Sequence, residues 1–257
     1  MSGWVLAAAI VVAVAAAVRS TWSPCGLSML STITPFTERA RGHRFGVTAS
    51  WFVAGAVVGG ATLGAVGAGL AWLVGATGLS PGGTLVVAAG LALAAGAVDA
   101  GAFGVRPPFF KRQVNDDWLR QYRPWVYGAG FGWQIGVGLA TYIMTAGVVL
   151  TLALAALTTA PAAAFVIGAG FGLLRGLAVF AGTRATDPTA LRALHARFDR
   201  LEAPVRIAVA VVQLVVAVVL GFVVAPVAGL TALVLAGAVA GLARPRRSAV
   251  VGLAAEG

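Results

Sequence analysis

The sequence predicts an all-α polytopic membrane protein, in which two inverted three-helix repeats are followed by a seventh transmembrane helix. Of its 257 residues, 60% are hydrophobic and only 10% are charged, whereas soluble domains carry roughly a quarter charged residues. Charge-free runs occupy 45–98, 124–174 and 207–243, and each exceeds the about 20 apolar residues that cross a bilayer core. This composition excludes a water-soluble globular fold, and internal matches 111 and 113 residues apart suggest a duplication.

The basic residues lie between the apolar runs and indicate the topology. The middle of each long run contains instead an uncharged break, at 80–83, at 158–161 and near Pro226. Under the positive-inside rule, this alternation predicts seven crossings of the plasma membrane, with the N-terminus outside and the C-terminus cytoplasmic. It also accounts for the net charge of +10, so we expect the lipid bilayer as a partner and no nucleic acid. The basic clusters lie at 39–44, 106–123, 184–206 and 244–247.

The expected elements follow these runs in order. The apolar stretch from Leu6 to Val18 also fits a signal peptide, but no Lys or Arg precedes it and no cleavage site is evident, so we assign it to the mature protein. The crossings are expected at 3–36, 46–75, 84–104, 126–157, 162–182, 207–225 and 227–243, the first and fourth of them broken. The predicted units are a first three-helix half (1–105), a cytoplasmic loop (106–125), the fourth and fifth helices (126–183), a cytoplasmic amphipathic helix (184–206), the sixth helix (207–225) and the seventh helix with a basic tail (226–257).

The first crossing must bend or break. A straight helix over 3–36 would measure about 51 Å, well beyond a hydrocarbon core of about 30 Å. We expect the break at 19–25, where Pro24 removes one helix hydrogen bond and neighbouring Ser and Thr hydroxyls can satisfy the released backbone groups.

The fourth crossing carries five glycines between Gly128 and Gly138. They allow either close helix packing or an unwound turn. Their spacing is not that of a dinucleotide-binding loop, and no strand precedes them. Small-residue packing is the expected role, as it is for the pairs Gly55/Gly59, Gly60/Gly64 and Gly172/Gly176.

An amphipathic helix is predicted between the fifth and sixth crossings, opening at Asp187 and Pro188. Its apolar residues, among them Phe198, recur at helical spacing opposite Arg192 and Arg197. Such a helix either lies on the cytoplasmic membrane surface or docks a partner protein. The pattern leaves both interpretations open.

The internal repeat relates the first three crossings to the next three. Residues 52–59 match 165–172 at five of eight positions, and Trp22 corresponds to Trp133. Because each half contains an odd number of crossings, the two halves would run in opposite directions across the membrane. Inverted repeats of this kind hold their working site where the halves meet, often on broken helices.

These features resemble the CcdA/DsbD-type transmembrane family. The resemblance covers roughly 15–225 and rests on the Ser-Pro-Cys segment at 23–25, an Arg-rich turn, a Gly-rich second helix beginning near Trp51, and the Gly-Phe-Gly-Trp segment at 130–133. It implies a dithiol relay that carries electrons from cytoplasmic thioredoxin to extracytoplasmic thiol proteins, in support of cytochrome c biogenesis. Family members use one cysteine in the first crossing and one in the fourth.

Cys25 matches the first of these cysteines, but the second is replaced. Where the family has Trp-x-Pro-Cys, this chain has Trp133, Gln134, Ile135 and Gly136, and it contains no other cysteine. Release of a mixed disulfide requires a second thiol. Either a thioredoxin-like partner or a second copy of the chain supplies it, or the scaffold no longer transfers electrons. Cys25 is thus either a catalytic thiol or a small packing residue, and whether the chain is an enzyme stays open.

Three ionisable residues lie within predicted crossings: Arg19, Asp99 and Arg175. Charges at membrane depth are costly and are therefore functional candidates. We expect the two arginines to line a polar cavity between the halves, with one of them paired to Asp99. The alternative for Asp99 is an ion pair at the interface, near Arg106. Further candidates around the bend at Pro24 are Trp22, Trp133, Gln134, Thr141, Tyr142, Thr145 and Gln213.

Three functions are compatible with these residues. The first is thiol-disulfide exchange at Cys25, and the alternative is a transporter that holds a small anionic solute near Arg19 and Arg175. The third is an assembly factor that binds a partner through the 188–204 helix. His43 and His195 lack further ligands at metal spacing, so we expect no metal site and no other cofactor.

Overall fold

The computed structural model describes residues 2–104 and 121–242, and all regular elements among them are helical. This confirms the all-α prediction. The longer helices are α1 (Ser2–Ser20), α4 (Phe45–Ala76), α5 (Pro81–Ala100), α9 (Pro161–Leu177) and α10 (Pro188–Val224). The shorter helices are α2 (Pro24–Thr32), α3 (Pro35–Ala40), α7 (Pro124–Val137), α8 (Gly147–Leu157) and α11 (Pro226–Leu242), with 3-10 segments η1 (Ala102–Gly104) and η2 (Ala178–Arg184).

Prolines define most of the helix starts. α2, α3, α5, α7, α9, α10 and α11 all begin at a proline, where the missing N–H would have had no helical partner in any case. Ser23, Thr34, Ser80 and Asp187 precede four of these prolines, and their side chains accept backbone N–H groups of the first turn. These helix boundaries are therefore determined locally.

Five described helices are long and apolar enough to cross a membrane: α1, α4, α5, α9 continued by η2, and α10. The chain is accordingly a multi-pass membrane protein. α8 and α11 are shorter apolar helices, so the complete fourth crossing and the seventh crossing stay predictions. The inverted repeat also stays a prediction.

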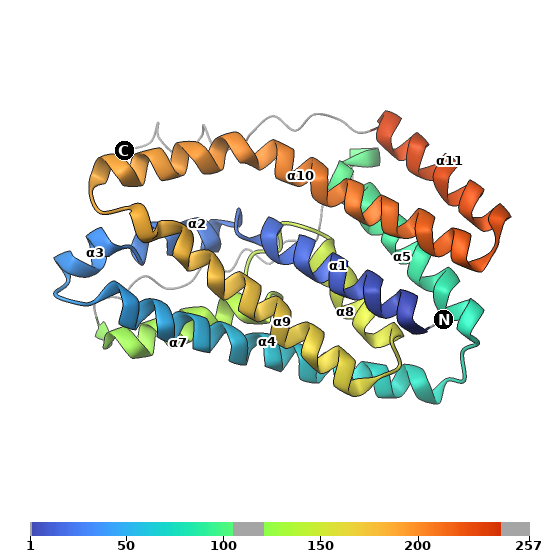
Figure 1. Ribbon diagram of the computed structural model, residues 1–257, viewed down its shortest axis with the longest axis horizontal. Helices are drawn as coiled ribbons and strands as arrows, with labels where there is room; N and C mark the ends of the chain where they lie inside the picture. Colours follow the sequence, from blue (N-terminus) through green and yellow to red (C-terminus); the bar gives the residue numbers. More distant parts are fainter. Residues whose placement is uncertain (1, 105–120, 243–257) are drawn as a thin grey trace.

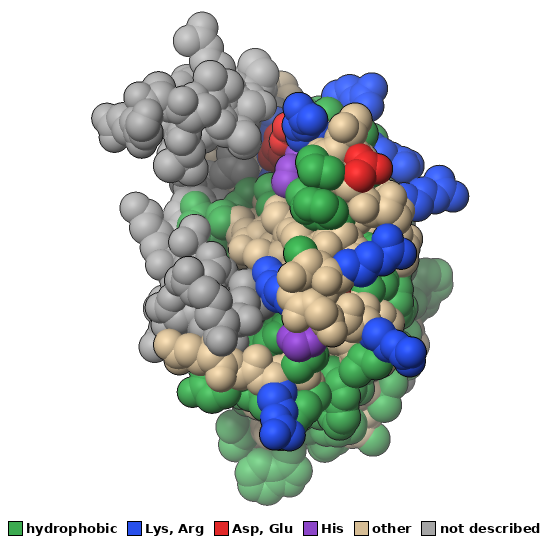
Figure 2. Space-filling view, turned by 90° about the vertical axis from the view of Figure 1, so that its left-hand side faces the viewer, with side chains coloured by type: hydrophobic (Ala, Val, Ile, Leu, Met, Phe, Trp, Pro, Cys, Tyr) green, Lys and Arg blue, Asp and Glu red, His purple; other side chains and the backbone are tan. Residues whose placement is uncertain are grey.

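The helices are arranged along the long axis of the molecule, with α4 in contact with α7 and α9, and α10 in contact with α5 (Figure 1). The connections at 77–80 and 158–160 lie at the same end as the start of α1, and they carry no charge. α3 and the start of α10 lie at the opposite end, where Figure 2 shows arginine side chains gathered. This separation agrees with the predicted alternation of uncharged and basic connections. Which end faces the cytoplasm stays a prediction.

The two predicted helix breaks exist, although the second is displaced. α1 ends at Ser20 and α2 begins at Pro24, within the expected interval. The glycines from Gly128 to Gly136 are helical, contrary to the possibility of an unwound turn there, and α7 ends only at Gly138, whose φ of +73° suits a residue without a side chain. The irregular segment is 138–146, before α8.

The predicted division into an amphipathic helix at 184–206 and a sixth helix at 207–225 is wrong. α10 is continuous over 37 residues with Pro204 in its interior, which makes it about 55 Å long. A proline removes only one helical hydrogen bond, and side chains on both sides of it, Phe198 and Arg206, are buried. Packing on both sides therefore keeps the helix continuous.

Glycines bring the backbone of α4 into direct contact with α7 and α9. A Cβ added to Gly132 would lie 2.0 Å from the Phe52 carbonyl oxygen, and one added to Gly168 would lie 2.4 Å from the Gly64 Cα. Such distances leave no room for a methyl group. Membrane helices associate largely through close packing of this kind, so the expected packing role of these glycines is confirmed.

We predict that Gly168→Ala destabilises the protein by about 1–3 kcal/mol, because the added methyl group must displace the backbone of α4. Gly170→Ala on the same helix is the matched control, since its Cβ would meet nothing within 4 Å. Thermal unfolding of the detergent-purified protein measures both. Equal unfolding temperatures for the two variants would contradict the packing argument.

Candidate functional site

The break between α1 and α2 is held by serine side chains. The Ser23 hydroxyl accepts a hydrogen bond from the Gly26 N–H at 3.1 Å, and the Ser20 hydroxyl donates to the Ala16 carbonyl at 2.7 Å. The first bond satisfies a backbone N–H group in the first turn of α2. The last carbonyls of α1, those of Val18, Arg19 and Ser20, accept the backbone N–H groups of Thr21, Trp22 and Ser23. Cys25 consequently lies in the first turn of α2, where it is 3% exposed.

The first half of α10 covers this break. The Trp22 indole N–H donates to the Phe198 carbonyl at 2.8 Å, and the two aromatic rings are 5.0 Å apart. One helical turn earlier, the His195 Nε2 atom is hydrogen-bonded to the Ser31 hydroxyl at 2.9 Å. Part of the apolar face predicted for a membrane surface or a partner, at Phe198 and Leu194, therefore packs on an apolar cluster of the same chain, whereas Leu201 of that face is exposed.

Arg19 forms an ion pair with Glu202 of α10. The Nη2 atom donates to Oε1 at 2.7 Å, and the arginine is 1% exposed. Arg19 lies in the last turn of α1, about 26 Å along the helix from Ser2. It is therefore near the basic end of the membrane-spanning region, and its partner is Glu202 instead of the expected Asp99.

Arg175 connects Cys25 with the end of α7. Its guanidinium is buried, donates from Nη1 to the Ile135 carbonyl at 2.5 Å, and lies 5.7 Å from the centre of the Phe171 ring. It also interacts electrostatically with the Cys25 side chain. The structure therefore brings Cys25 and the segment next to Gly136 to the same positive charge, although 111 residues separate them in sequence.

Gly136, at the position of the second family cysteine, faces the backbone of α4. A Cβ built on it would lie 2.1 Å from the Ala56 carbonyl oxygen of α4. No side chain fits there, because α7 and α4 are in backbone contact. In this backbone, a cysteine at 136 would be directed into α4, so the glycine serves helix packing.

Asp99 is held by neutral groups. Its Oδ1 accepts the Ala146 N–H at 2.9 Å, and its Oδ2 accepts the Gln213 Nε2 at 2.8 Å and the Thr145 hydroxyl. Neither ion pair found among the described residues includes Asp99. The expected pairing with Arg19 or Arg175 is therefore wrong, and Arg106 lies outside the described residues.

The residues predicted to line one cavity lie in different parts of the structure. Trp133 is 42% exposed and donates to the Thr62 hydroxyl at 3.3 Å, so it lies on the outside of the α4–α7 pair. Gln134 is half-buried, whereas Thr141 is buried in the irregular segment after α7. Trp22 contacts Phe198 at the α1–α2 break, Arg175 interacts with Cys25, and Thr145 and Gln213 surround Asp99.

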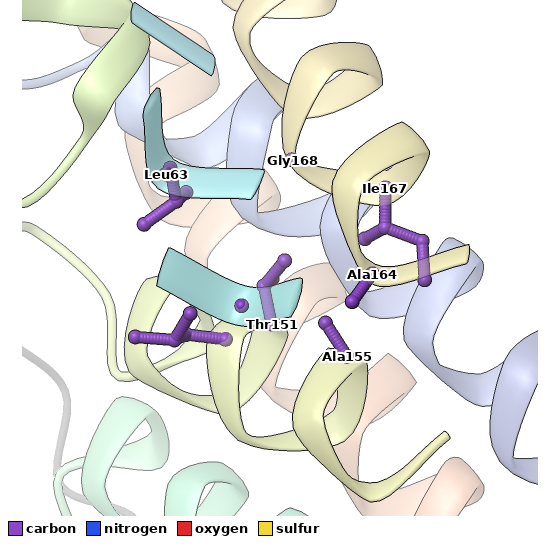
Figure 3. A pocket seen from close by; sticks show the side chains of 8 residues that line it. Leu63, Thr151, Ala155, Ala164, Ile167 and Gly168 are labelled. Atoms are coloured by element: carbon purple, nitrogen blue, oxygen red, sulfur yellow. The ribbon is translucent and has the colours of Figure 1, made fainter. Parts of the chain in front are cut away.

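A small cavity lies at the junction of α4, α8 and α9 (Figure 3). Its volume of about 10 Å³ is at the limit for a single water molecule. Its walls are apolar apart from Thr151, and neither Arg19 nor Arg175 belongs to them. It therefore does not match the predicted polar cavity. Across residues 2–104 and 121–242, no three His, Cys, Asp or Glu side chains gather as a metal site would require.

Glu38 is a buried acid that the sequence reasoning missed. Its carboxylate accepts hydrogen bonds from Thr48 of α4 and from Tyr127 of α7, the latter at 2.9 and 3.0 Å, and it pairs with Arg41 at 2.9 Å. These bonds connect α3 to α4 and α7. In the sequence, Glu38 is an acid among arginines directly after an apolar run. Exposed acids in surface turns show the same pattern, so the sequence did not indicate that Glu38 is buried.

The chain is similar to curated proteins named methylamine utilization protein MauF. It is 35% identical to that of Paracoccus versutus over 175 residues, which are 65% of this chain and 61% of the relative. The corresponding values are 33% over 174 residues for Paracoccus denitrificans (65% and 60%) and 27% over 192 residues for Methylophilus methylotrophus (74% and 67%).

The chain is a distant homologue of the MauF proteins. The match spans about six tenths of the length of the two Paracoccus relatives. No family model matches the chain, and no solved structure matches it significantly. The CcdA/DsbD resemblance therefore stays a prediction beside the MauF homology.

We predict that Glu202→Gln destabilises the protein by about 2 kcal/mol, because it leaves the buried Arg19 without its carboxylate. The double variant Arg19→Met, Glu202→Gln should lose less than the sum of the two single losses. Asp199→Asn, which alters an exposed acid on the same helix, should stay within about 0.5 kcal/mol of the parent. Chemical denaturation of the purified protein measures all four, and strict additivity would refute the coupling.

Proposed function

We propose that the chain is a membrane thiol-exchange protein with Cys25 as its exchange sulfur, and that it serves methylamine utilization as the names of its MauF relatives suggest. The carrying observation is the environment of Cys25: a buried thiol in the first turn of a helix, within the field of Arg175. The CcdA/DsbD resemblance independently assigns thiol chemistry to the same residue.

The chemistry is a sequence of sulfur exchanges. The Cys25 thiolate attacks one sulfur of a disulfide in a partner protein, and the other sulfur leaves as a thiolate that takes up a proton. A further thiol then attacks the mixed disulfide and releases Cys25. Because this chain has one cysteine, the further thiol belongs to a partner or to a second copy. Each step conserves the number of disulfides.

Two positive features lie near Cys25. The first turn of α2 presents the positive end of the helix dipole to Cys25. The Arg175 guanidinium, held in place by the Ile135 carbonyl and the Phe171 ring, interacts electrostatically with the same side chain. Positive charge beside a cysteine favours the thiolate form, which is the form that attacks a disulfide.

Access to Cys25 is controlled by the first half of α10. Its contacts with Trp22 and Ser31, and the Arg19–Glu202 ion pair, cover the helix break from the basic end. A partner that reaches Cys25 from that end displaces these contacts. Glu202 is 24% exposed and the Trp22–Phe198 hydrogen bond is only partly buried. The contacts that cover the helix break are therefore close to the molecular surface.

The two other functions have weaker support. An anion transporter needs positive charge available to a solute, but Arg19 is paired with Glu202 and Arg175 is bonded to a carbonyl. An assembly factor would use the apolar face of the 188–204 segment, yet Phe198 is buried and Leu194 packs on the same apolar cluster as Leu30. Thiol exchange is therefore the function that the geometry supports best.

We predict that acid quenching and alkylation of native membranes recover Cys25 in a mixed disulfide with a partner protein. Non-reducing electrophoresis and mass spectrometry identify the adduct. Cys25→Ser should abolish both the adduct and the activity in the native host, because a hydroxyl does not exchange with disulfides. Full activity of Cys25→Ser in that host would exclude the proposal.

We also predict that Arg175→Met slows the reaction of Cys25 with a small disulfide reagent about tenfold, which corresponds to the loss of roughly 1.4 kcal/mol of stabilisation of the sulfur anion. Arg175→Lys should retain part of the rate, since it keeps the charge. Arg192→Met, an exposed arginine of α10, is the control and should leave the rate unchanged. An identical rate in Arg175→Met would show that its charge does not act on Cys25.

A further inference from the structure

Asp99 lies in the last turn of α5. It contacts Gln213, which lies 11 residues before the end of α10, and Thr145, shortly before α8. Both helices end beside uncharged connections, and at 1.5 Å per residue these contacts lie about 17 Å from that end. Along α5 itself, Asp99 lies about 27 Å from Pro81. Each distance is shorter than the about 30 Å of a bilayer core, so the site lies within the length of the spanning helices.

The carboxylate there has hydrogen-bond donors but no positive partner among the described residues. Its three donors are an N–H group, a hydroxyl and a carboxamide. The elements packed on α5 carry few ionisable groups: α8 and α11 carry none, α1 carries Arg19, and α10 carries Glu202 and Arg206 near this region. Arg19 is paired with Glu202, and Arg206 lies two turns before Gln213. The negative charge of Asp99 is thus uncompensated by an ion pair.

Gln213 supplies a second, independent observation. Its side chain is completely buried, its Nε2 donates to Asp99, and its Oε1 has no hydrogen-bond partner within residues 2–104 and 121–242. Buried amide oxygens are almost always satisfied. If the Gln213 carboxamide group rotated by 180°, its Oε1 would take the position of Nε2, 2.8 Å from the Asp99 Oδ2. An oxygen in that position accepts a proton bound to the carboxyl, or shares a cation with it.

We infer that Asp99, Thr145 and Gln213 form a binding site for a monovalent cation, either a proton or Na⁺. Both neutralise a single carboxylate, and both require an oxygen where Nε2 now lies. The site lies at the irregular 138–146 segment, and irregular backbone at membrane depth characteristically surrounds ion sites. The absence of a side chain at Gly147 keeps the site compact, because a Cβ there would lie 2.8 Å from the Gln213 Nε2.

Two measurements on the purified full chain distinguish the two cations. In the first, thermal unfolding is compared in sodium chloride and choline chloride at equal ionic strength and pH. A bound Na⁺ raises the unfolding temperature by about 2–4 °C or more. In the second, infrared difference spectra between alkaline and acidic choline buffers detect the C=O stretch of a protonated carboxyl. A bound proton produces this band without any effect of Na⁺.

Asp99→Asn should remove whichever response the parent shows. Glu38→Gln is the matched control, since it also removes a buried carboxylate, but one already paired with Arg41, and it should retain the response. Gln213→Met keeps Asp99 and removes the amide oxygen, so it should weaken the response even if Asp99→Asn does not fold. No response of the parent to either cation, or responses that persist in Asp99→Asn or remain unchanged in Gln213→Met, would overturn the inference. Because Cys25 takes no part, these outcomes are independent of thiol exchange.

Discussion

The backbone contact of α4 with α7 and α9 is the constraint on which the rest of the structure depends. In a membrane, lipid tails are as apolar as the side chains, so helices gain stability from close packing more than from burial. Gly132 and Gly136 let α7 approach α4 until no Cβ fits between them, and Gly168 does the same for α9. With α7 and α9 both held against α4, the Ile135 carbonyl of α7 meets Arg175 of α9. The same packing excludes a side chain at position 136 and separates this scaffold from a two-cysteine relay within one chain.

Three of the buried charges lie in separate clusters, and each joins helices that are distant in sequence. Arg19 joins α1 to α10 through Glu202, Arg175 joins α9 to α7 and approaches Cys25, and Asp99 joins α5 to α8 and α10. Charges at membrane depth are costly, and each of these groups is accompanied by polar partners that reduce that cost. Thiol chemistry and cation binding, as proposed, would therefore use different clusters of the same bundle.

Much of the fold was accessible from sequence because its signals are local. Charge-free runs identified the apolar helices, Pro24 identified the first break, and Asp187 identified a helix start. Arg19 and Arg175 were expected inside the bundle because few alternatives exist for a charge inside an apolar run, whereas Asp99 was expected either there or in an ion pair at the interface. Their partners were not recognised, and neither was Glu38, because an acid among arginines next to a helix end looks the same in sequence whether it is exposed or buried.

By itself, the sequence determined composition, helix starts, the first break and the alternation of basic and uncharged connections, since each depends on residues within a few turns of one another. Only the tertiary structure decided that α10 runs on through Pro204, that Glu202 partners Arg19, and that Gly136 faces α4. These outcomes depend on which helix faces meet. Packing decides which faces meet, and it joins residues up to 183 positions apart in the sequence. The residues next to one partner in the sequence do not indicate which distant residue it contacts.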